Sequence, residues 1–453
     1  MMEELTDFIE SNRERFIKDL IRLCEKPSVS AQNLGIEECV ETLVDMMSEV
    51  GVKTHLKRLE GANPVVIGEV NSKGVEHTIG FYNHYDVQPV DPLDLWASPP
   101  FKPEVRNGKI YGRGVSDNKG NIVARLKAVE AVSEVLGKVP VNIRFLIEGE
   151  EEIGSIHLPR YVKENMDLLR AEGYFWEGDG VDEKDRPILT LGAKGILTVE
   201  LTAIGPSRDA HSSWAPLLPN PAWRLVWALA TIKGEDERIK ISGWYDDVKE
   251  PSEEEVKLLE EIPFDEDAEK KRFGIQRYLG GVSGVESRKK LYYGTTCNIC
   301  GFDSGYKGPG MKTVLPSIAK VKLDFRLVEA QNPDKLYESL VNYLKAEGFG
   351  DIKVEKLGGY EAAKTSPSDP FVKLVVGKLE EVYGVKPVVI PTTAGTTPIY
   401  LIKNWMNTPV VSGGGVGYPE SNIHSPNENI RVEDFIRSIK FYARFIASYA
   451  ERP

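Results

Sequence analysis

Short apolar runs alternate with amphipathic segments over the first 195 residues. Four of these runs have the length and composition of buried strands, and they lie at 65–70, 78–82, 141–147 and 173–176. The segment 121–136 has the spacing of an amphipathic helix and is followed by Gly137, a common helix stop. This alternation predicts a doubly wound α/β domain with a mainly parallel sheet.

The pattern changes near residue 196. The run ILTVELTAIG alternates as a strand does, and a helix at 221–232, a strand at 320–327 and a helix at 334–347 are expected after it. Such an order suits a small α+β domain. From residue 362 the α/β pattern returns, with a helix at 370–383, a strand at 387–390 and a last helix from 432. We therefore expect one domain of residues 1–195 and 362–453, with a second domain of residues 196–361 inserted into it.

Length and charge narrow the class of protein. A chain of 453 residues exceeds the roughly 250–300 residues of a single core, so two domains are expected. The net charge of −12, without a basic patch, argues against a nucleic-acid partner. The first 23 residues read as one amphipathic helix and not as a signal peptide, and no apolar run approaches the ~18 residues of a membrane span. A cytoplasmic protein is expected.

The four cysteines, at 24, 39, 297 and 300, are too few for a disulfide framework. Cys297 and Cys300 have the spacing of half a zinc ribbon, but the second pair that such a site requires is absent. All four are therefore expected to be buried structural thiols.

Candidate chemistry follows the predicted strands. The sequence EGEEE at 148–152 ends one apolar run, and adjacent carboxylates at a strand's end point to opposite sides, so that one binds a metal while its neighbour faces a reacting water. His84 and Asp86 project to the same side, which suits a metal-binding imidazole oriented by a carboxylate. Asp117 in GRGVSDNKG and His424 in SNIHSPNEN occupy similar loops. Taken singly, Asp117 also suits a helix N-cap and His84 a hydrogen-bonded core histidine.

Five motifs together carry a family resemblance: HYDVQP at 84–89, GRGVSDNKG at 112–120, EGEEEIGS at 148–155, DAHSS at 209–213 and HSPNE at 424–428. In this order they resemble the di-zinc carnosinase, aminoacylase and glutamate carboxypeptidase superfamily. The sequence KTVLP at 312–316, ahead of Arg326, is similar to the carnosinase-like cytosolic dipeptidase branch.

The resemblance implies two zinc ions per subunit, with Mn or Co possible in their place. The implied metal ligands are His84, Asp117, Glu152, Glu177 and His424. By the same resemblance Asp117 bridges the ions, Asp86 orients His84, and Glu151 is the general base for a metal-bridging hydroxide. The segment FWEGD leaves both Glu177 and Asp179 open as a ligand, and Glu177 is favoured because it directly follows the strand.

The inserted domain is implied to be a lid and dimerisation domain. Similar enzymes use a histidine at the position of His211 from the partner subunit to stabilise the oxyanion, which implies a functional homodimer. Arg326, with Thr313 and the glycine-rich loop 301–310, is implied to hold the substrate's terminal carboxylate. Gly395 and Thr396 are further expected substrate contacts.

The function expected is that of a zinc metallopeptidase, a dipeptidase or carboxypeptidase acting on dipeptides or on the C-terminal bond of short peptides. An N-acyl amino acid amidohydrolase, such as a deacetylase or desuccinylase, would use the same centre. A non-catalytic peptide-binding scaffold is a third possibility, since fold alone does not establish function.

Overall fold

The computed structural model describes residues 2–449 and divides into two compact units. The first unit takes Met1–Leu191, Thr365–Pro391 and Leu401–Pro453, and the second takes Gly192–Lys364 and Thr392–Tyr400. The second unit therefore includes a short segment, 392–400, that the hydrophobic pattern does not separate from its surroundings. Among residues 2–449, every helix is too short or too polar to cross a lipid bilayer.

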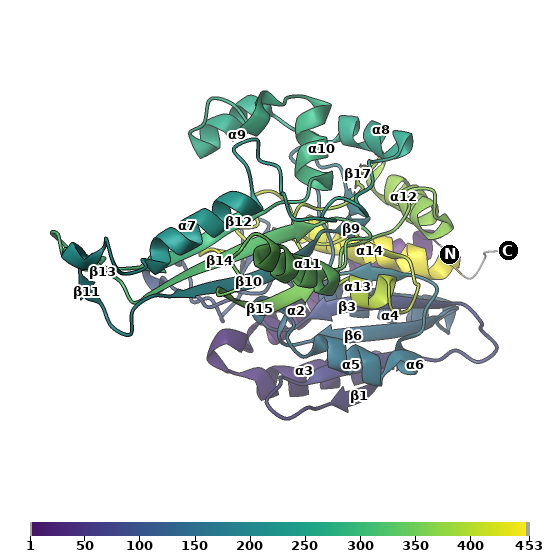
Figure 1. Ribbon diagram of the computed structural model, residues 1–453. Coiled ribbons are helices and arrows are strands. Elements are labelled where there is room, and N and C mark those ends of the chain that lie inside the picture. The colour runs from purple at the N-terminus through teal and green to yellow at the C-terminus, as the bar shows by residue number, and fades with distance from the viewer. Residues whose placement is uncertain (1, 450–453) are drawn as a thin grey trace. The chain divides into compact units, whose positions relative to one another are not determined.

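An eight-stranded sheet forms the centre of the first unit (Figure 1). Its strands, in spatial order, are β1 (Lys53–Lys57), β2 (Val65–Val70), β6 (Asn142–Glu148), β3 (Thr78–His84), β7 (Tyr174–Trp176), β18 (Val410–Gly413), β8 (Ile188–Thr190) and β17 (Val388–Ile390). The four adjacent strands β6, β3, β7 and β18 pair in parallel, whereas β1, β2 and β6 pair antiparallel. The predicted α/β fold with a mainly parallel sheet is confirmed.

Helices pack against this sheet and against one another. α4 (Lys119–Leu136) contacts β3, α2 (Arg13–Cys24) and α14 (Val432–Tyr449), and α14 also contacts α1 (Met2–Ser11) and α12 (Pro370–Tyr383). α3 (Ile36–Glu49) packs on β1 and β2, and α6 (Met166–Leu169) packs on β6. Other elements of this unit include α5 (Leu158–Glu164), most of α13 (Tyr400–Lys403), β4 (Glu104–Arg106), β5 (Lys109–Tyr111) and β19 (Asn429–Arg431).

The single helix expected at the N-terminus is wrong, because α1 and α2 are separated at Asn12. The Asn12 side-chain amide donates a hydrogen bond to the Phe8 carbonyl at 2.9 Å, and the backbone at Asn12 leaves the helical region. Side chains of this kind compete with the helix for backbone partners. The hydrophobic spacing continues across the break, so the pattern alone does not reveal it.

The second unit contains a four-stranded antiparallel sheet in the order β12 (Asn298–Ser304), β14 (Ile318–Leu327), β10 (Gly195–Ile204) and β15 (Lys353–Tyr360). Burial alternates along β10 and β14, so one face of the sheet is apolar. α7 (Pro221–Ile232) and α11 (Pro333–Ala346) cover that face. Two short pairs complete the strands: β11 (Ala210–His211) with β13 (Val314–Leu315), and β9 (Gly192–Ala193) with β16 (Ala363–Lys364).

The structure around edge strand β12 differs from the sequence-based expectation in two ways. The glycine-rich segment 301–310 was expected to be a loop, but it is strand as far as Ser304, with a register irregularity beside Gly301. Cys300 lies on this strand and is exposed, while Cys24, Cys39 and Cys297 are buried as predicted. Most residues of this edge strand, on both of its faces, are exposed, and Cys300 is one of them.

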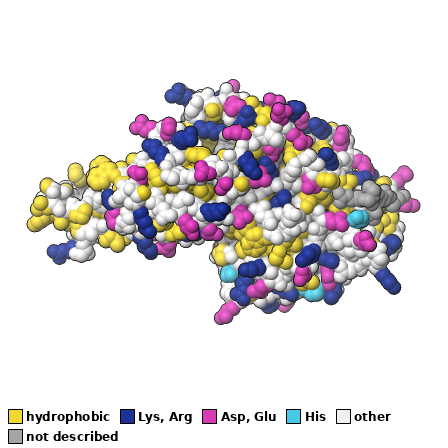
Figure 2. Space-filling model, turned by 45° about the vertical axis from the view of Figure 1, so that its right-hand side comes forward, with side chains coloured by type: hydrophobic (Ala, Val, Ile, Leu, Met, Phe, Trp, Pro, Cys, Tyr) yellow, Lys and Arg dark blue, Asp and Glu magenta, His cyan; other side chains and the backbone are white. Residues whose placement is uncertain are grey.

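Large apolar side chains are exposed on the second unit, and Figure 2 shows hydrophobic groups gathered at its α7, β11 and β13 end. The exposed residues at this end include Trp214, Leu217, Trp223, Val226 and Trp227. The rings of Trp223 and Trp227, one helical turn apart on α7, stack at 6.0 Å. An exposed cluster of this kind is typical of an interaction surface.

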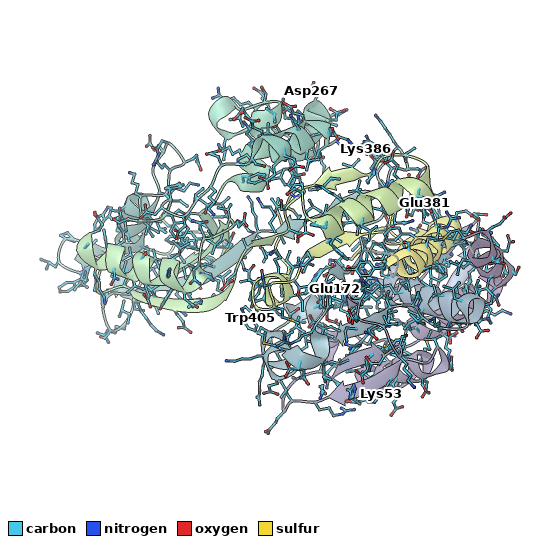
Figure 3. The ribbon with its side chains drawn as sticks, turned by 90° about the vertical axis from the view of Figure 1, so that its right-hand side faces the viewer. Lys53, Glu172, Asp267, Glu381, Lys386 and Trp405 are labelled. Carbon is cyan, nitrogen blue, oxygen red and sulfur yellow. The ribbon has the colours of Figure 1, made fainter. Side chains whose placement is uncertain are left out.

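The acidic segment at 250–271 forms α8 (Glu253–Glu261) and most of α9 (Glu266–Phe273), followed by α10 (Val285–Tyr293). Ser252 and Glu255 cap α8 reciprocally. Leu259, on the inner side of α8, is buried. Asp267 on α9 extends into solvent (Figure 3), and its side chain is 97% exposed. The segment is a solvated helical surface, as its composition indicates.

Candidate metal centre

Three parallel strands deliver side chains to the same edge of the first unit's sheet. His84 is the last residue of β3, Glu151 and Glu152 follow β6 in a short turn, and Glu177 directly follows β7. The backbones of β6 and β7 both pair with β3, so the three carboxyl ends lie together. Ligand sites in open α/β sheets occur at this position.

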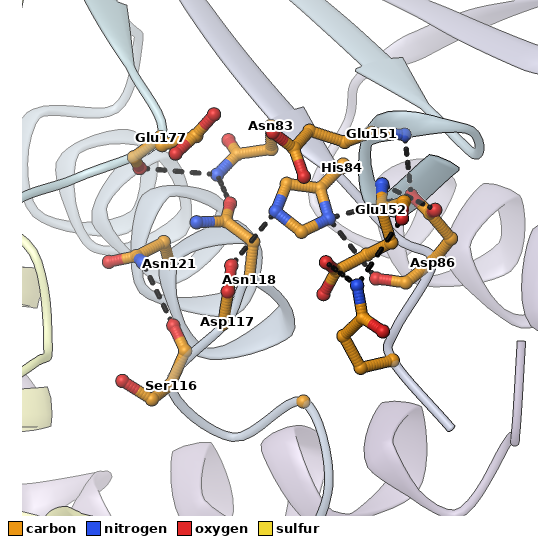
Figure 4. Close-up of polar contacts among 12 residues, drawn as sticks. Asn83, His84, Asp86, Ser116, Asp117, Asn118, Asn121, Glu151, Glu152 and Glu177 are labelled. Carbon is orange, nitrogen blue, oxygen red and sulfur yellow. Dashed lines mark hydrogen bonds and ion pairs between the residues drawn. The ribbon is translucent and has the colours of Figure 1, made fainter. Parts of the chain in front are cut away.

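Asp117 enters from the loop before α4 and contacts two histidines, His84 and His424. Figure 4 shows the contact with His84. Its Oδ1 lies 2.9 Å from Nε2 of His84, and its Oδ2 lies 3.0 Å from Nε2 of His424. Each carboxylate oxygen therefore faces a different imidazole. This is the arrangement that a carboxylate shared between two cations requires.

Glu152 joins the same cluster. Its Oε2 lies 3.1 Å from Nε2 of His424, and the side-chain amide of Gln88 donates to the same carboxylate at 2.8 Å. One potential ligand atom from each of His84, Asp117 and Glu152 lies within 4.8 Å of the other two. Imidazole nitrogen and carboxylate oxygen are donors that zinc accepts, so this set fits a divalent metal.

Asp86 is fully buried and connects His84 to the glutamate turn. Its Oδ1 accepts the backbone N–H of Glu151 at 3.2 Å, and its Oδ2 accepts that of Glu152 at 3.1 Å. Nδ1 of His84 lies 3.1 Å from the Asp86 carbonyl and 3.5 Å from its Oδ1. Asp86 therefore holds both an imidazole and the turn in place, an arrangement that commonly supports metal-binding histidines.

Glu177 and Asp179 occupy different surroundings. Glu177 is half-buried, and loss of solvent around its carboxyl, with the charges of Glu151 and Asp117, raises its pKa well above the usual value. Asp179 instead bonds with Thr190 and Ser412, and burial raises its pKa to about 6. The Asp179 carboxyl therefore belongs to the packing between β8 and β18, whereas the pKa of Glu177 responds to the charges of Glu151 and Asp117.

Several groups of the cluster have strongly shifted pKa values. Bonds to Asp117 and Glu152 raise the pKa of His424 to about 10. Burial opposes ionisation of Asp117, but its bonds to His424 and His84 outweigh burial and lower its pKa. Burial, with the negative charges of Asp117 and Glu152, raises the pKa of Glu151 to about 7. Such perturbed groups gathered at one place are typical of active sites.

The other predicted residues lie in the second unit and form two groups. His211 on β11 is exposed, and its Nε2 lies 3.4 Å from the Thr313 hydroxyl. Arg326 on β14 donates to the Thr396 hydroxyl at 2.6 Å, and the Gly395 carbonyl accepts the backbone N–H of Lys194 at 3.0 Å.

The two groups lie at opposite ends of β14. Thr313 precedes β14, which begins at Ile318, and Arg326 is its penultimate residue. At about 3.3 Å per residue, roughly 26 Å of strand separate Ile318 from Arg326. β13, which follows Thr313, lies beyond the start of β14 (Figure 1). Within one chain, Thr313 and Arg326 therefore do not reach the same small ligand.

One residue of the centre was not singled out from the sequence. Glu428 is fully buried and bonds to the loop that carries Asp117, including the backbone N–H of Asp117 at 3.0 Å. Burial raises its pKa, against the guanidinium of Arg113 and the backbone donors, which favour the charged form. Its place in the HSPNE motif, four residues after His424, is the only sequence signal that it carries.

Comparisons with known proteins agree with this geometry. The model of peptidase family M20/M25/M40 matches residues 80–448. The Cys-Gly metallodipeptidase dug1 of Schizosaccharomyces pombe is 27% identical over 99% of this chain and 98% of its own length. The Beta-Ala-His dipeptidase of Homo sapiens is 28% identical over 86% of this chain and 78% of its own.

A solved structure extends the similarity to the whole fold. The M20 family metallo-carboxypeptidase Sso-CP2 from Sulfolobus solfataricus has a TM-score of 0.88 and 39% identity, and the match covers 96% of this chain and 99% of that one.

Proposed function

Because this chain belongs to peptidase family M20/M25/M40, we propose that it is a metal-dependent peptidase that hydrolyses dipeptides or the C-terminal bond of short peptides. The observation that carries the proposal is the double contact of Asp117, whose two oxygens face His84 and His424. We propose two zinc ions per subunit, with Mn or Co able to replace them. Their ligands would be His84, Asp117, Glu152, Glu177 and His424.

Bound divalent cations would polarise the scissile carbonyl and lower the pKa of the attacking water. Glu151 would accept the proton of that water and deliver it to the departing amine. Glu151 suits this role because its carboxylate is mostly buried among the ligands, while its backbone N–H is fixed by Asp86. Asp86 would orient His84 without contacting the substrate.

Arg326 would bind the terminal carboxylate of the peptide. Its planar guanidinium can offer two parallel N–H groups to a carboxylate, and the Thr396 hydroxyl, which Arg326 contacts at 2.6 Å, restricts its orientation. Gly395 and Thr396 would line the same end of the substrate. Recognition of a free carboxylate would direct cleavage to the C-terminal residue.

His211 and Thr313 would act from the partner subunit of a homodimer. The length of β14 supports this, since one chain does not bring them to a ligand that Arg326 holds. The exposed apolar residues around Trp223 and Trp227 supply a surface for a second copy of this chain. We also propose a cytoplasmic location, because all four cysteines are free thiols, as a reducing compartment maintains them.

A substrate panel tests the proposed function. Protein stripped with a chelator and reloaded with zinc is assayed against dipeptides, tripeptides and N-acetyl and N-succinyl amino acids. Peptide cleavage that depends on metal, and that exceeds deacylation, is expected. Faster release of acetate or succinate would make the enzyme an N-acyl amino acid amidohydrolase, and peptide binding without turnover would make it a scaffold.

A further inference from the structure

Glu428 connects the two loops that supply Asp117 and His424. It lies four residues after His424 and directly before β19, and its side chain is fully buried. From there it reaches residues 112–117, more than 300 positions earlier in the chain. Within the described residues, the loop of one candidate ligand is thus bonded to the loop of another.

Both oxygens of the Glu428 carboxylate are fully used as acceptors. Oε1 accepts the backbone N–H groups of Ser116 at 2.9 Å and Asp117 at 3.0 Å. Oε2 accepts the backbone N–H of Gly114 at 2.9 Å and Nη1 of Arg113 at 2.9 Å. The Glu428 carbonyl also accepts the N–H of Gly112 at 3.0 Å.

The loop is shaped around this carboxylate. Gly114 has a φ of 89°, a conformation that favours glycine, and it turns its N–H toward Glu428. Arg113 is itself 2% exposed and is fixed on its far side by the Pro89 carbonyl at 3.1 Å. An ion pair with Arg113 alone would not need three converging backbone donors. The contacts therefore position the loop, and with it the Cα of Asp117.

We infer that Glu428 is a positioning residue for the metal centre: by binding the backbone of residues 114–117 it places the Asp117 carboxylate between His84 and His424. This inference rests on the proposed function. It assigns to Glu428 a role through Asp117, with no contact to substrate or metal.

The substitutions that test Glu428 are chosen from the four N–H groups that donate to its carboxylate. In Glu428→Gln the amide nitrogen replaces one of the two oxygens, so a donor would face two further donors in a buried site. Glu428→Asp keeps the charge but shortens the side chain by one methylene, so it does not reach all four donors. Supporting residues of this kind typically change metal affinity by about 10–100-fold when altered.

The test measures zinc affinity and stoichiometry by competition with a chromophoric chelator, and the melting temperature of each protein in excess chelator. Asp434→Asn is the matched control, because Asp434 is a buried carboxylate on α14 paired with Arg431 and Arg437. We expect both Glu428 variants to bind zinc about 10–100-fold more weakly than the parent, and Asp434→Asn to bind it as the parent does.

Two results would overturn this. If the Glu428 variants melt at a lower temperature but keep the zinc affinity of the parent, the residue serves only stability. If Asp434→Asn weakens zinc binding as much as they do, the effect is a general loss of packing. Should Glu428→Gln not fold, Glu428→Asp carries the comparison alone. A parent protein that binds no zinc would instead refute the proposed function.

Discussion

At the residue scale, the adjacent glutamates Glu151 and Glu152 have different contacts. Glu152 contacts His424 and Gln88, so its carboxylate is committed to the ligand cluster. Asp86 holds the backbone N–H groups of both residues, and burial, with the charges of Asp117 and Glu152, favours the protonated form of the Glu151 side chain. This division follows from the short turn after β6, which directs successive side chains to different places.

Replacing Glu151 with Gln should remove the proton acceptor and keep the metal. We expect kcat to fall by about 10²–10⁴, the usual contribution of a general base, with zinc content unchanged. Steady-state hydrolysis of a good dipeptide and metal analysis of the same sample measure both quantities. Glu152→Gln is the control and should lose zinc. Parent-like turnover by Glu151→Gln would exclude Glu151 as the base.

Most members of the candidate cluster could be predicted from the sequence, because the motifs around His84, Asp117, Glu151 and His424 are short and contiguous. Glu177 and Asp179 could not be separated in that way. In the structure Asp179 bonds with Thr190 on β8 and with Ser412 on β18, which is 233 positions later in the chain, and these contacts support Glu177 as the proposed ligand. The role of Glu428 is hidden for the same reason, since its partners precede it by more than 300 positions.

At the scale of elements, the sequence predicted regular strands and helices. It did not predict a break within a helix or a strand at the edge of a sheet. The segments assigned to β2, β3, β6 and α7 lie where the apolar pattern predicts them. The break at Asn12 and the edge strand β12 were missed. Each depends on a local hydrogen bond or on a neighbouring strand, which hydrophobic spacing does not record.

An ion-paired carboxylate in the hairpin of β1 and β2 should make the stability of the protein depend on pH. Bonds to His55, then Asn71, and also Lys53 lower the pKa of Glu69 from 4.5 to about 2. A lowered folded-state pKa contributes stability above the unfolded value, and that stability is lost as pH falls from about 4.5 to about 2. Glu69→Gln should therefore cost roughly 1 kcal/mol of unfolding free energy at neutral pH and progressively less in acid.

Urea unfolding of the chelator-treated parent and Glu69→Gln proteins, from pH 7 down to about pH 3, tests this. Lys53→Met is the comparison, because the Lys53 side chain is 71% exposed and should contribute less than Glu69. A stability difference between parent and Glu69→Gln that stays constant over the whole range would contradict the assignment.

At the scale of the whole molecule, the proposed homodimer divides each active site between two chains. His211→Ala and Glu151→Gln proteins should each be nearly inactive alone. Mixed by co-expression, they should regain about a quarter of the parent activity, since half of the dimers would be mixed and each would have one complete site. Activity of the separate and co-expressed proteins measures this. No recovery in verified mixed dimers would place His211 within its own chain's site.

The two-unit organisation was partly visible in the sequence, because the strand pattern changes near residue 196 and again near 362. The sequence did not show that the segment 392–400 belongs to the second unit, because this segment is short and has no hydrophobic periodicity of its own. It joins the second unit through contacts such as Thr396 with Arg326 and Gly395 with Lys194.

The central claim is that Asp117 lies between two cations. Anomalous diffraction at the zinc edge, from crystals grown with zinc, tests it most directly. The account predicts two peaks, one beside His84 and Glu177 and the other beside Glu152 and His424, with an oxygen of Asp117 on each. A single peak away from Asp117, or no peak at all in zinc-saturated crystals, would contradict it.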